Sequence, residues 1–470
     1  MWLNILQLMQ QLGYEIDEKG MCVGFGSMGM QAILAGQFKV LQKRMHVLHS
    51  YQTSEDVINA IQEANQARQS QQILSSKQKS LLSLQPFFDG VCLYHLPEKF
   101  PDLFVSSFLQ QQKKVLPLTL PQKLELDEKC SDPTKEGNVE KIRTFSGVYS
   151  RQELIDYLTI LYREFKTQTR PIAFMLENAD HAITIGYDPK LRSLLFVNND
   201  DVMAFGTIEK LADEILAAFK SPDKPIILAT KIYNRKSQHT PVYHAFKKCE
   251  ADPLWKKIHE VTPQKAKWID NTNTSWLYIA AEQGLSQQVQ SLIENGALEC
   301  SAPSHTGWTP LTCAADNGHI DVVKLLLENK VDPNEKNQYG KTALNIAAKK
   351  GHVDIVRFLL ARDEQFATVF QLLQLLDQLS NHIPYSEIIE ETYKQFLLNL
   401  KNEDAIRACL EHLIDHVETS LDTLKNQEPT LFPAENPLAA QLKKALEIYD
   451  ANISLIPCDI IKTCTHSNNP

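Results

Sequence analysis

One cysteine near the start of the chain lies between glycines, in the segment Gly20-Met21-Cys22-Val23-Gly24. A helical pattern follows it, from Met28 to about Val47. A cysteine where a glycine-rich turn enters a helix lies against the unpaired N–H groups and the positive end of that helix. Because this environment favours the nucleophilic thiolate, we expect Cys22 to be a reactive cysteine with a lowered pKa.

A histidine farther along the chain has the position that a thiolate partner requires. His181 lies 159 positions after Cys22 and begins a predicted strand, and a polar turn starting at Asn198 ends the next strand. In an antiparallel pair, the start of one strand lies beside the end of its partner. We therefore expect His181 and Asn198 to be neighbours. A thiolate that attacks an acyl carbon, an imidazole that protonates the leaving group and a carboxamide that orients the ring would form a catalytic triad.

The elements around these residues indicate an α+β fold, in which helices come first and a mostly antiparallel sheet follows. The periodicity predicts helices over residues 2–12, 28–47, 54–84, 152–165 and 208–219. It predicts strands over residues 172–176, 182–187, 193–197, 202–205 and 225–232. Residues 87–96 are expected to be strand-like or irregular, and the polar stretch 121–144 is expected to be a surface loop.

Internal repeats begin near Ile269. The segment Gly307-Trp308-Thr309-Pro310-Leu311 recurs from Gly340, a period of 33 residues, and the segment around Gly318-His319 recurs around Gly351-His352 at the same period. A degenerate copy precedes them near Trp276. These copies resemble the ankyrin repeat, which binds proteins through hairpin tips and a concave helical face. His319 and His352 occupy structural positions of that pattern.

The resemblance implies a binding surface on the repeats. We expect its tip segments and their aromatic neighbours to contact a protein partner, because aromatic residues are enriched in interface hot spots. The alternative for Trp308 is that it packs between repeats. The expected partner-binding residues are His305, Trp308, Lys336, Gln338 and Tyr339.

The motif around Cys22 and the strand His181-Ala182-Ile183-Thr184-Ile185 are similar to those of papain-like cysteine peptidases carried by bacterial virulence factors, the YopT/AvrPphB-like group. That resemblance implies a Cys-His-Asn triad of Cys22, His181 and Asn198. The group often has Asp-Pro-Asn after the second strand, which this chain lacks. The third member therefore stays open among Asn198, Asn199 and Asp200, and we favour Asn198.

The oxyanion donor is a second open point. The backbone N–H of Cys22 would supply one donor. Papain-like enzymes usually carry a glutamine shortly before the cysteine, whereas the nearest ones here are Gln10 and Gln11.

The chain as a whole is predicted to have four parts: a papain-like domain (1–234), a linker helix (235–268), three ankyrin repeats (269–362) and a helical C-terminal domain (363–470). This combination resembles AnkH-type ankyrin-repeat effectors, which bacteria deliver into host cells through a type IV secretion system. The resemblance implies a cysteine-protease-like protein that the repeats target to a host protein in the host cytoplasm or nucleus. The alternatives are a non-enzymatic scaffold with a decayed papain fold and a papain-fold transferase or deamidase.

The composition excludes several other classes. The net charge is −9 over 470 residues, which argues against direct nucleic-acid binding. Nine scattered cysteines without a Cys-x-x-Cys pair argue against a disulfide scaffold or a thiolate metal site. The start of the chain has no basic region of the signal-peptide kind, and no apolar run is long enough to span a membrane. We expect a monomer that needs no metal or cofactor.

Overall fold

The computed structural model describes residues 4–14, 16, 21–95, 139–235, 239–300, 307–337, 339–350 and 352–361. Its residues fall into two compact units, Met1–His305 and Thr306–Pro470. The predicted helical domain at 363–470 lies outside the described residues.

A six-stranded antiparallel sheet organises the first unit, in the order β1-β6-β2-β3-β4-β5. Its strands are β1 (Val139–Tyr149), β2 (Ile172–Glu177), β3 (Ala182–Asp188), β4 (Ser193–Asn198), β5 (Asp201–Phe205) and β6 (Ile226–Arg235). The five predicted strands are present, and the mixed helical and antiparallel fold class is confirmed. The loop predicted at 121–144 is wrong for residues 139–144, which belong to β1. The polar residues of this edge strand obscure the alternation that would indicate a strand.

The helices before the sheet are α1 (Ile5–Gln11), α2 (Met21–Leu34), α3 (Phe38–His49), α4 (Ser54–Gln69), α5 (Ser76–Leu82) and α6 (Leu84–His95). The single helix predicted over 28–47 is wrong, because Gly36 adopts a φ of 69° and separates α2 from α3. The helix predicted over 54–84 is likewise divided between α4 and α5. The strand-like segment predicted at 87–96 belongs to α6, whose apolar run packs against α2.

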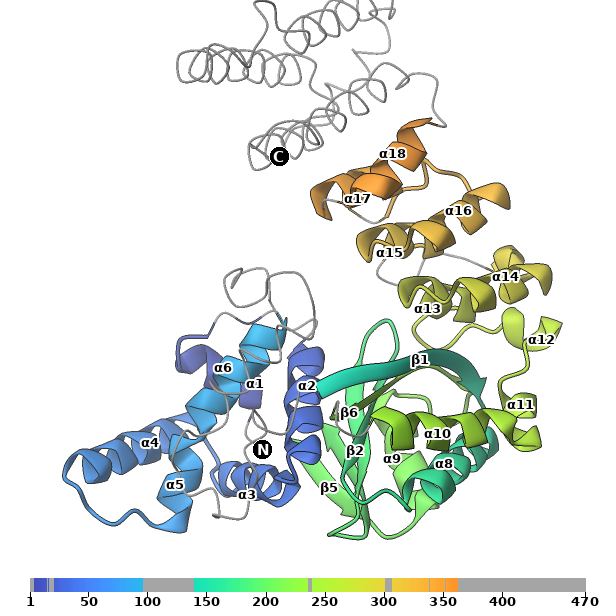
Figure 1. The fold of residues 1–470 in the computed structure, drawn as a ribbon. Coiled ribbons are helices and arrows are strands. Elements are labelled where there is room, and N and C mark those ends of the chain that lie inside the picture. The colour runs from blue at the N-terminus through green and yellow to red at the C-terminus, as the bar shows by residue number, and fades with distance from the viewer. Residues whose placement is uncertain are drawn as a thin grey trace, which may run out of the picture. The chain divides into compact units, whose positions relative to one another are not determined.

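Helices cover both faces of the sheet and give it two cores (Figure 1). On one face, α2 lies across β2, β3 and β4. On the other face lie α8 (Arg151–Phe165), α9 (Ile208–Ala218), α10 (His239–Ala251) and α11 (Pro253–Ile258). The side chains of strand β2 alternate between the two cores, with Met175 toward α2 and Phe174 toward α8 and α10.

Helix α2 is tied to the sheet along its length. Thr184 on β3 donates a buried hydrogen bond from Oγ1 to the Gly26 carbonyl at 2.7 Å. Arg235 on β6 donates from Nε to the Leu34 carbonyl at 2.9 Å, at the C-terminal end of the helix, where carbonyls lack intrahelical partners. Gly29 faces Val197 on β4 so closely that a Cβ atom there would lie 2.7 Å from the valine Cγ1. This close approach brings the middle of α2 against β4.

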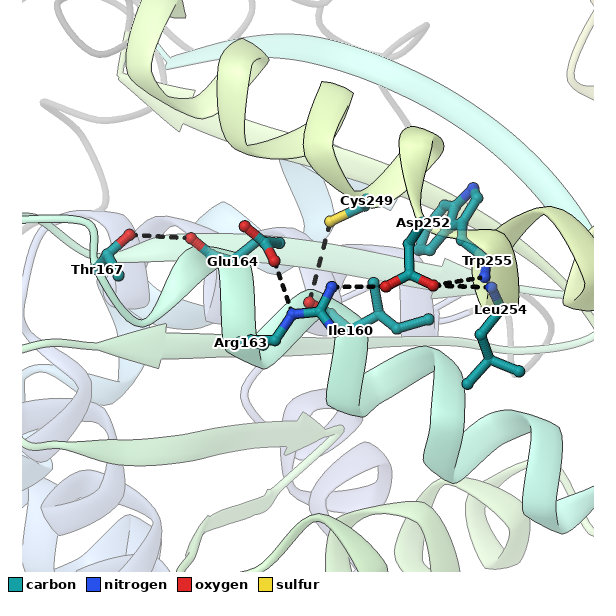
Figure 2. Close-up of polar contacts among 8 residues, drawn as sticks. All are labelled: Ile160, Arg163, Glu164, Thr167, Cys249, Asp252, Leu254 and Trp255. Carbon is teal, nitrogen blue, oxygen red and sulfur yellow. Dashed lines mark hydrogen bonds and ion pairs between the residues drawn. The ribbon is translucent and has the colours of Figure 1, made fainter.

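The segment predicted as one solvated linker helix, 235–268, differs in the structure. It contains α10, α11 and α12 (Pro263–Ala266), and α10 and α11 pack into the core beside α8. Figure 2 shows the joint: the Arg163 guanidinium of α8 binds Glu164 and Asp252 at 2.7 Å each, and Asp252 caps the first turn of α11. Apolar residues at helical spacing, such as Phe246 and Trp255, explain why these helices are buried rather than solvated.

The first ankyrin repeat, α13 (Trp276–Glu282) and α14 (Ser286–Glu294), packs against the edge strand β1. Trp276 donates from Nε1 to Ser146 Oγ at 2.9 Å, and Ser146 Oγ donates to Gln288 Oε1 at 2.5 Å. Gln288 Nε2 donates to the Ser146 carbonyl at 3.0 Å. These bonds hold the repeat on an edge that would otherwise be open to strand pairing.

The second unit contains the two repeats closest to the ankyrin pattern. They are α15 (Pro310–Asp316) with α16 (Ile320–Glu328), and α17 (Ala343–Lys350) with α18 (Val353–Ala361). Thr309 caps α15, and Pro310 occupies its first turn. His352 bonds the Asp316 carbonyl of the preceding repeat through Nε2 at 2.8 Å, which is a structural role.

The glycines of α2 provide a matched test of its packing. We expect Gly29→Ala to lower the free energy of unfolding by about 1–3 kcal/mol, because the branched Val197 side chain occupies the space of the new methyl group. Gly26→Ala is the control: its nearest neighbour would be Thr184 Oγ1 at 3.5 Å, and alanine favours helix by up to about 1 kcal/mol. Urea denaturation measures both. Equal stabilities would contradict the packing of α2 on β4.

Candidate functional site

Cys22 is the second residue of α2, which begins at Met21 rather than at the predicted Met28, so Gly24 and Gly26 lie within the helix and not in a turn before it. Its Sγ atom lies 4.0 Å from the carbonyl oxygen of Asp180, in the turn between β2 and β3. The backbone N–H of Ala182 also acts on the sulfur. The structure therefore brings Cys22 to the residues on both sides of His181.

His181 and Asn198 are brought together across neighbouring strands. The imidazole Nε2 lies 2.7 Å from Asn198 Oδ1, and both side chains are partly buried. The ring also packs edge-on against Phe219, with centroids 5.5 Å apart. An amide oxygen only accepts hydrogen bonds, so Nε2 carries the hydrogen and Nδ1 is left as the basic nitrogen.

The other two residues considered for the third position have different roles in the turn. Asn199 adopts a φ of 52°, the left-handed conformation that asparagine tolerates in tight turns. Asp200 binds His49 on α3, with Oδ2 2.8 Å from Nε2. Of the three residues, the structure thus places Asn198 on the imidazole of His181.

A residue that the sequence analysis missed holds the His181 backbone in place. Asn178, buried at the end of β2, accepts hydrogen bonds through Oδ1 from the N–H groups of Asp180 at 3.0 Å and His181 at 2.8 Å. Its own N–H donates to the His181 carbonyl at 3.0 Å. Asparagine often begins a tight turn by accepting hydrogen bonds from the N–H groups two or three residues later. Asn178 is therefore a signal that the sequence could have supplied.

The electrostatics of the site differ from the expectation for a helix-start cysteine. Burial raises the pKa of the Cys22 thiol, and this effect outweighs the N–H groups of Ala182, Val23 and Cys22 itself, which lower it. Burial also lowers the pKa of His181, more than its bond to Asn198 raises it. The predicted lowering of the Cys22 pKa is therefore wrong: burial favours the neutral thiol of Cys22 and the neutral imidazole of His181.

A second missed feature is an ion pair on the same face of the sheet. Lys231 on β6 binds Glu177 on β2, with Nζ 2.5 Å from Oε2, and both side chains are largely buried. The negative charge of Glu177 adds to the rise in the Cys22 pKa. Two charged residues in neighbouring strands gave no sequence signal, because they lie 54 positions apart.

The other expected residues have simpler surroundings. Gln10 and Gln11 are exposed on α1, and no bond to Cys22 involves them. Among the expected partner-binding residues, Lys336 and Tyr339 are exposed, Tyr339 to 63%, and Trp308 is partly buried. His305 and Gln338 lie outside the described residues.

Two kinds of site are not found in the described part of the chain. No group of three or more histidine, cysteine, aspartate or glutamate side chains could hold a metal ion there. Among the same residues, no helix combines the length and apolar character needed to cross a membrane.

Comparison with known proteins identifies the repeats. A family model for ankyrin repeats matches three copies at residues 277–369. The chain is 42% identical over 60 residues to alpha-latrocrustotoxin-Lt1a of Latrodectus tredecimguttatus, which covers 13% of this chain and 4% of the toxin. It is 38% identical over 64 residues to the 2-5A-dependent ribonuclease of Mus musculus, which covers 14% of this chain and 9% of that protein. The chain thus contains ankyrin repeats and spans only a small part of these relatives.

The surroundings of Cys22 predict its pH dependence. Alkylation requires the thiolate, so its rate rises with pH as the thiol loses its proton. Because the pKa is raised, we expect the midpoint of this rise to lie at a pH above the ordinary cysteine pKa of about 8.5. Glu177→Gln removes a nearby negative charge and should move that midpoint to lower pH. Mass spectrometry of the Cys22 peptide after timed iodoacetamide labelling measures both. The exposed substitution Glu209→Gln should leave the midpoint unchanged, and a wild-type midpoint below the ordinary value would contradict this electrostatic description.

Proposed function

We propose that the protein is a papain-like thiol enzyme, with Cys22 as nucleophile, His181 as general base and acid, and Asn198 as the residue that orients the imidazole. The observation that carries the proposal is the 2.7 Å contact between His181 Nε2 and Asn198 Oδ1, in a turn that also contacts the Cys22 sulfur. The three residues come from α2, the β2–β3 turn and the end of β4. Their types and order are those of acyl transfer through a thioester.

The electrostatics define how this chemistry would proceed. Because the resting pair is neutral, His181 Nδ1 takes the proton from Cys22 as the sulfur attacks the acyl carbon. The resulting imidazolium donates that proton to the leaving group, and a thioester remains on Cys22. Water or an amine then attacks the thioester after His181 removes its proton, which releases the acyl group and restores the thiol. The helix-start N–H groups of Cys22 and Val23 would stabilise the oxyanion.

The same neutral pair is also the observation that favours a different function. A buried thiol with a raised pKa is typical of an inert cysteine. A non-enzymatic scaffold, which binds proteins through its repeats alone, would need no reactivity at Cys22. A transferase or deamidase would use the same three residues as a hydrolase, and differs only in the group that attacks or leaves.

The repeats give the proposal its partner class. Ankyrin repeats indicate protein–protein interaction. We infer that they bring a host protein to the thiol site, and that the chain is an effector of the AnkH type, secreted through a type IV system and acting in the host cytoplasm or nucleus. The support for secretion and host targeting is the combination of repeats with a papain-like site.

An electrophilic acyl mimic tests the catalytic proposal. At pH 7, a peptide vinyl sulfone or aldehyde should label Cys22, and His181→Ala should slow the labelling by about 10²–10⁴-fold because the base is lost. Asn198→Ala should slow it less, since the imidazole remains. Cys22→Ser should abolish it. Peptide-resolved mass spectrometry gives the rates.

An exposed histidine of α10 supplies the control for that experiment. His244→Ala should react at the wild-type rate. Equal rates for wild type and His181→Ala, with folding verified by circular dichroism, would exclude the triad and leave the scaffold function. Release of the acyl group by added amine rather than water would indicate a transferase.

The repeat surface generates a separate prediction. Replacing Lys336, Tyr339, Gln338 and His305 by alanine should reduce the affinity for a partner at least about 100-fold, because the set includes an exposed aromatic residue of the hot-spot type. A partner isolated with the Cys22→Ser protein would be used, and calorimetry would measure its affinity.

The change should leave the protein otherwise intact. The melting temperature and the rate of Cys22 labelling should match those of the wild type, as they should for the exposed control Glu328→Ala. Retained affinity would move the partner site away from these residues, whereas a lower melting temperature would show that they are structural.

A further inference from the structure

A hollow of about 550 Å³ lies between helix α3 and the edge strand β5. Pockets that bind small ligands have volumes of about 300–1,000 Å³, so this one is large enough for a ligand. One wall is a single face of α3, and the other is the turn into β5. The residues that matter here are Lys39, Lys43, His46, His49, Asp200 and Met203.

The α3 wall is rich in hydrogen-bond donors with positive charge. Lys39, Lys43 and His46 recur at intervals of four and three residues, which places them on one face of the helix. Lys43 Nζ binds Ser76 Oγ, a neutral hydroxyl that leaves the ammonium charge uncompensated. Within the described ranges, neither lysine has a carboxylate partner. Two unneutralised ammonium groups therefore face the hollow.

Two acidic residues, Asp200 and Asp201, lie on the opposite wall of the hollow. Asp200 is already engaged by His49, and only about a quarter of each side chain is exposed, 27% and 26% respectively. Burial and the charge of Asp200 raise the pKa of Asp201, and His49 lowers it. With Asp200 held by His49, the ammonium groups of Lys39 and Lys43 are the groups on the α3 wall that an anion would contact.

We propose that this hollow is a binding site for an anionic group, either a carboxylate or a phosphate, held by Lys39 and Lys43 with the imidazoles of α3. Ammonium and imidazole N–H groups bind both anions through charge-assisted hydrogen bonds. An acidic protein segment and a phosphate-bearing small molecule present the same chemistry, and a comparison of their affinities separates them.

The hollow adjoins the turn that carries Asn198. Asn198 pairs with Asp201 across the β4–β5 turn, and Asp200 lies between them beside His49. An anion that binds His49 competes with Asp200, so the turn moves and the contact of Asn198 with His181 changes. This step rests on the proposed function, whereas the anion site itself does not.

Methyl NMR tests the site directly. The Cys22→Ser protein, labelled with ¹³C at its methionine methyl groups, reports from Met45 and Met203, which line the hollow. The probes are inorganic phosphate, a glutamate-rich peptide and the matching glutamine-rich peptide. We expect saturable shifts of both signals with the two anions and none with the glutamine peptide. Tighter binding of the glutamate peptide assigns the site to an acidic protein segment, and tighter binding of phosphate assigns it to a phosphate-bearing ligand.

Charge reversal supplies the matched variants. Lys39→Glu with Lys43→Glu changes two exposed side chains and should weaken anion binding at least about 10-fold. Lys210→Glu with Lys224→Glu, two exposed lysines that do not line the hollow, should change it less than about 2-fold at the same ionic strength. Absence of a saturable shift with either anion, or equal affinity in the Lys39/Lys43 variant, overturns the site.

A labelling experiment on protein that retains Cys22 tests the link to the turn. A saturating anion should change the rate of Cys22 labelling at least about 3-fold in the wild type and not in the Lys39/Lys43 variant. An unchanged rate refutes the link while the NMR result still decides the site. If Cys22 is not labelled at all, with or without the anion, the proposed function is refuted instead.

Discussion

The close approach of α2 to the sheet is the constraint on which the site depends. Glycine at position 29 lets the helix meet Val197, and Thr184 and Arg235 bind the carbonyls of Gly26 and Leu34. A helix held at its middle and its C-terminal end has little freedom at its first turn. Cys22 is in that first turn, so its sulfur reaches the β2–β3 turn without any contribution from a long loop.

The β2–β3 turn supplies the other half of the geometry. Asn178 fixes the backbone of His181, and Asn198 fixes its ring, so the imidazole is held from two directions. The burial that produces this order also removes water from the thiol and the imidazole, which raises one pKa and lowers the other. Order and reactivity are thus opposed in the resting site, and in the proposed mechanism proton transfer from Cys22 to His181 accompanies attack on the acyl group.

The sequence predicted the features that depend on local pattern. Alternating apolar residues indicated five of the six strands, and the pairing of antiparallel strands predicted that His181 lies beside Asn198. Tertiary packing decided the rest. The apolar run around Val91 resembles a strand but forms α6, because it packs on α2. Edge strand β1 was missed because its polar residues obscure the alternating pattern, and the raised Cys22 pKa depends on a burial that no motif encodes.

The tautomer of His181 tests the central claim most directly. Long-range ¹H–¹⁵N NMR of the histidine-labelled protein, with His181→Ala to assign the signal, shows which ring nitrogen carries the hydrogen. We predict a neutral ring at pH 7 with the hydrogen on Nε2, where it donates to Asn198 Oδ1, and with Nδ1 unprotonated. A hydrogen on Nδ1 alone, or an unchanged His181 signal in Asn198→Ala, would contradict it.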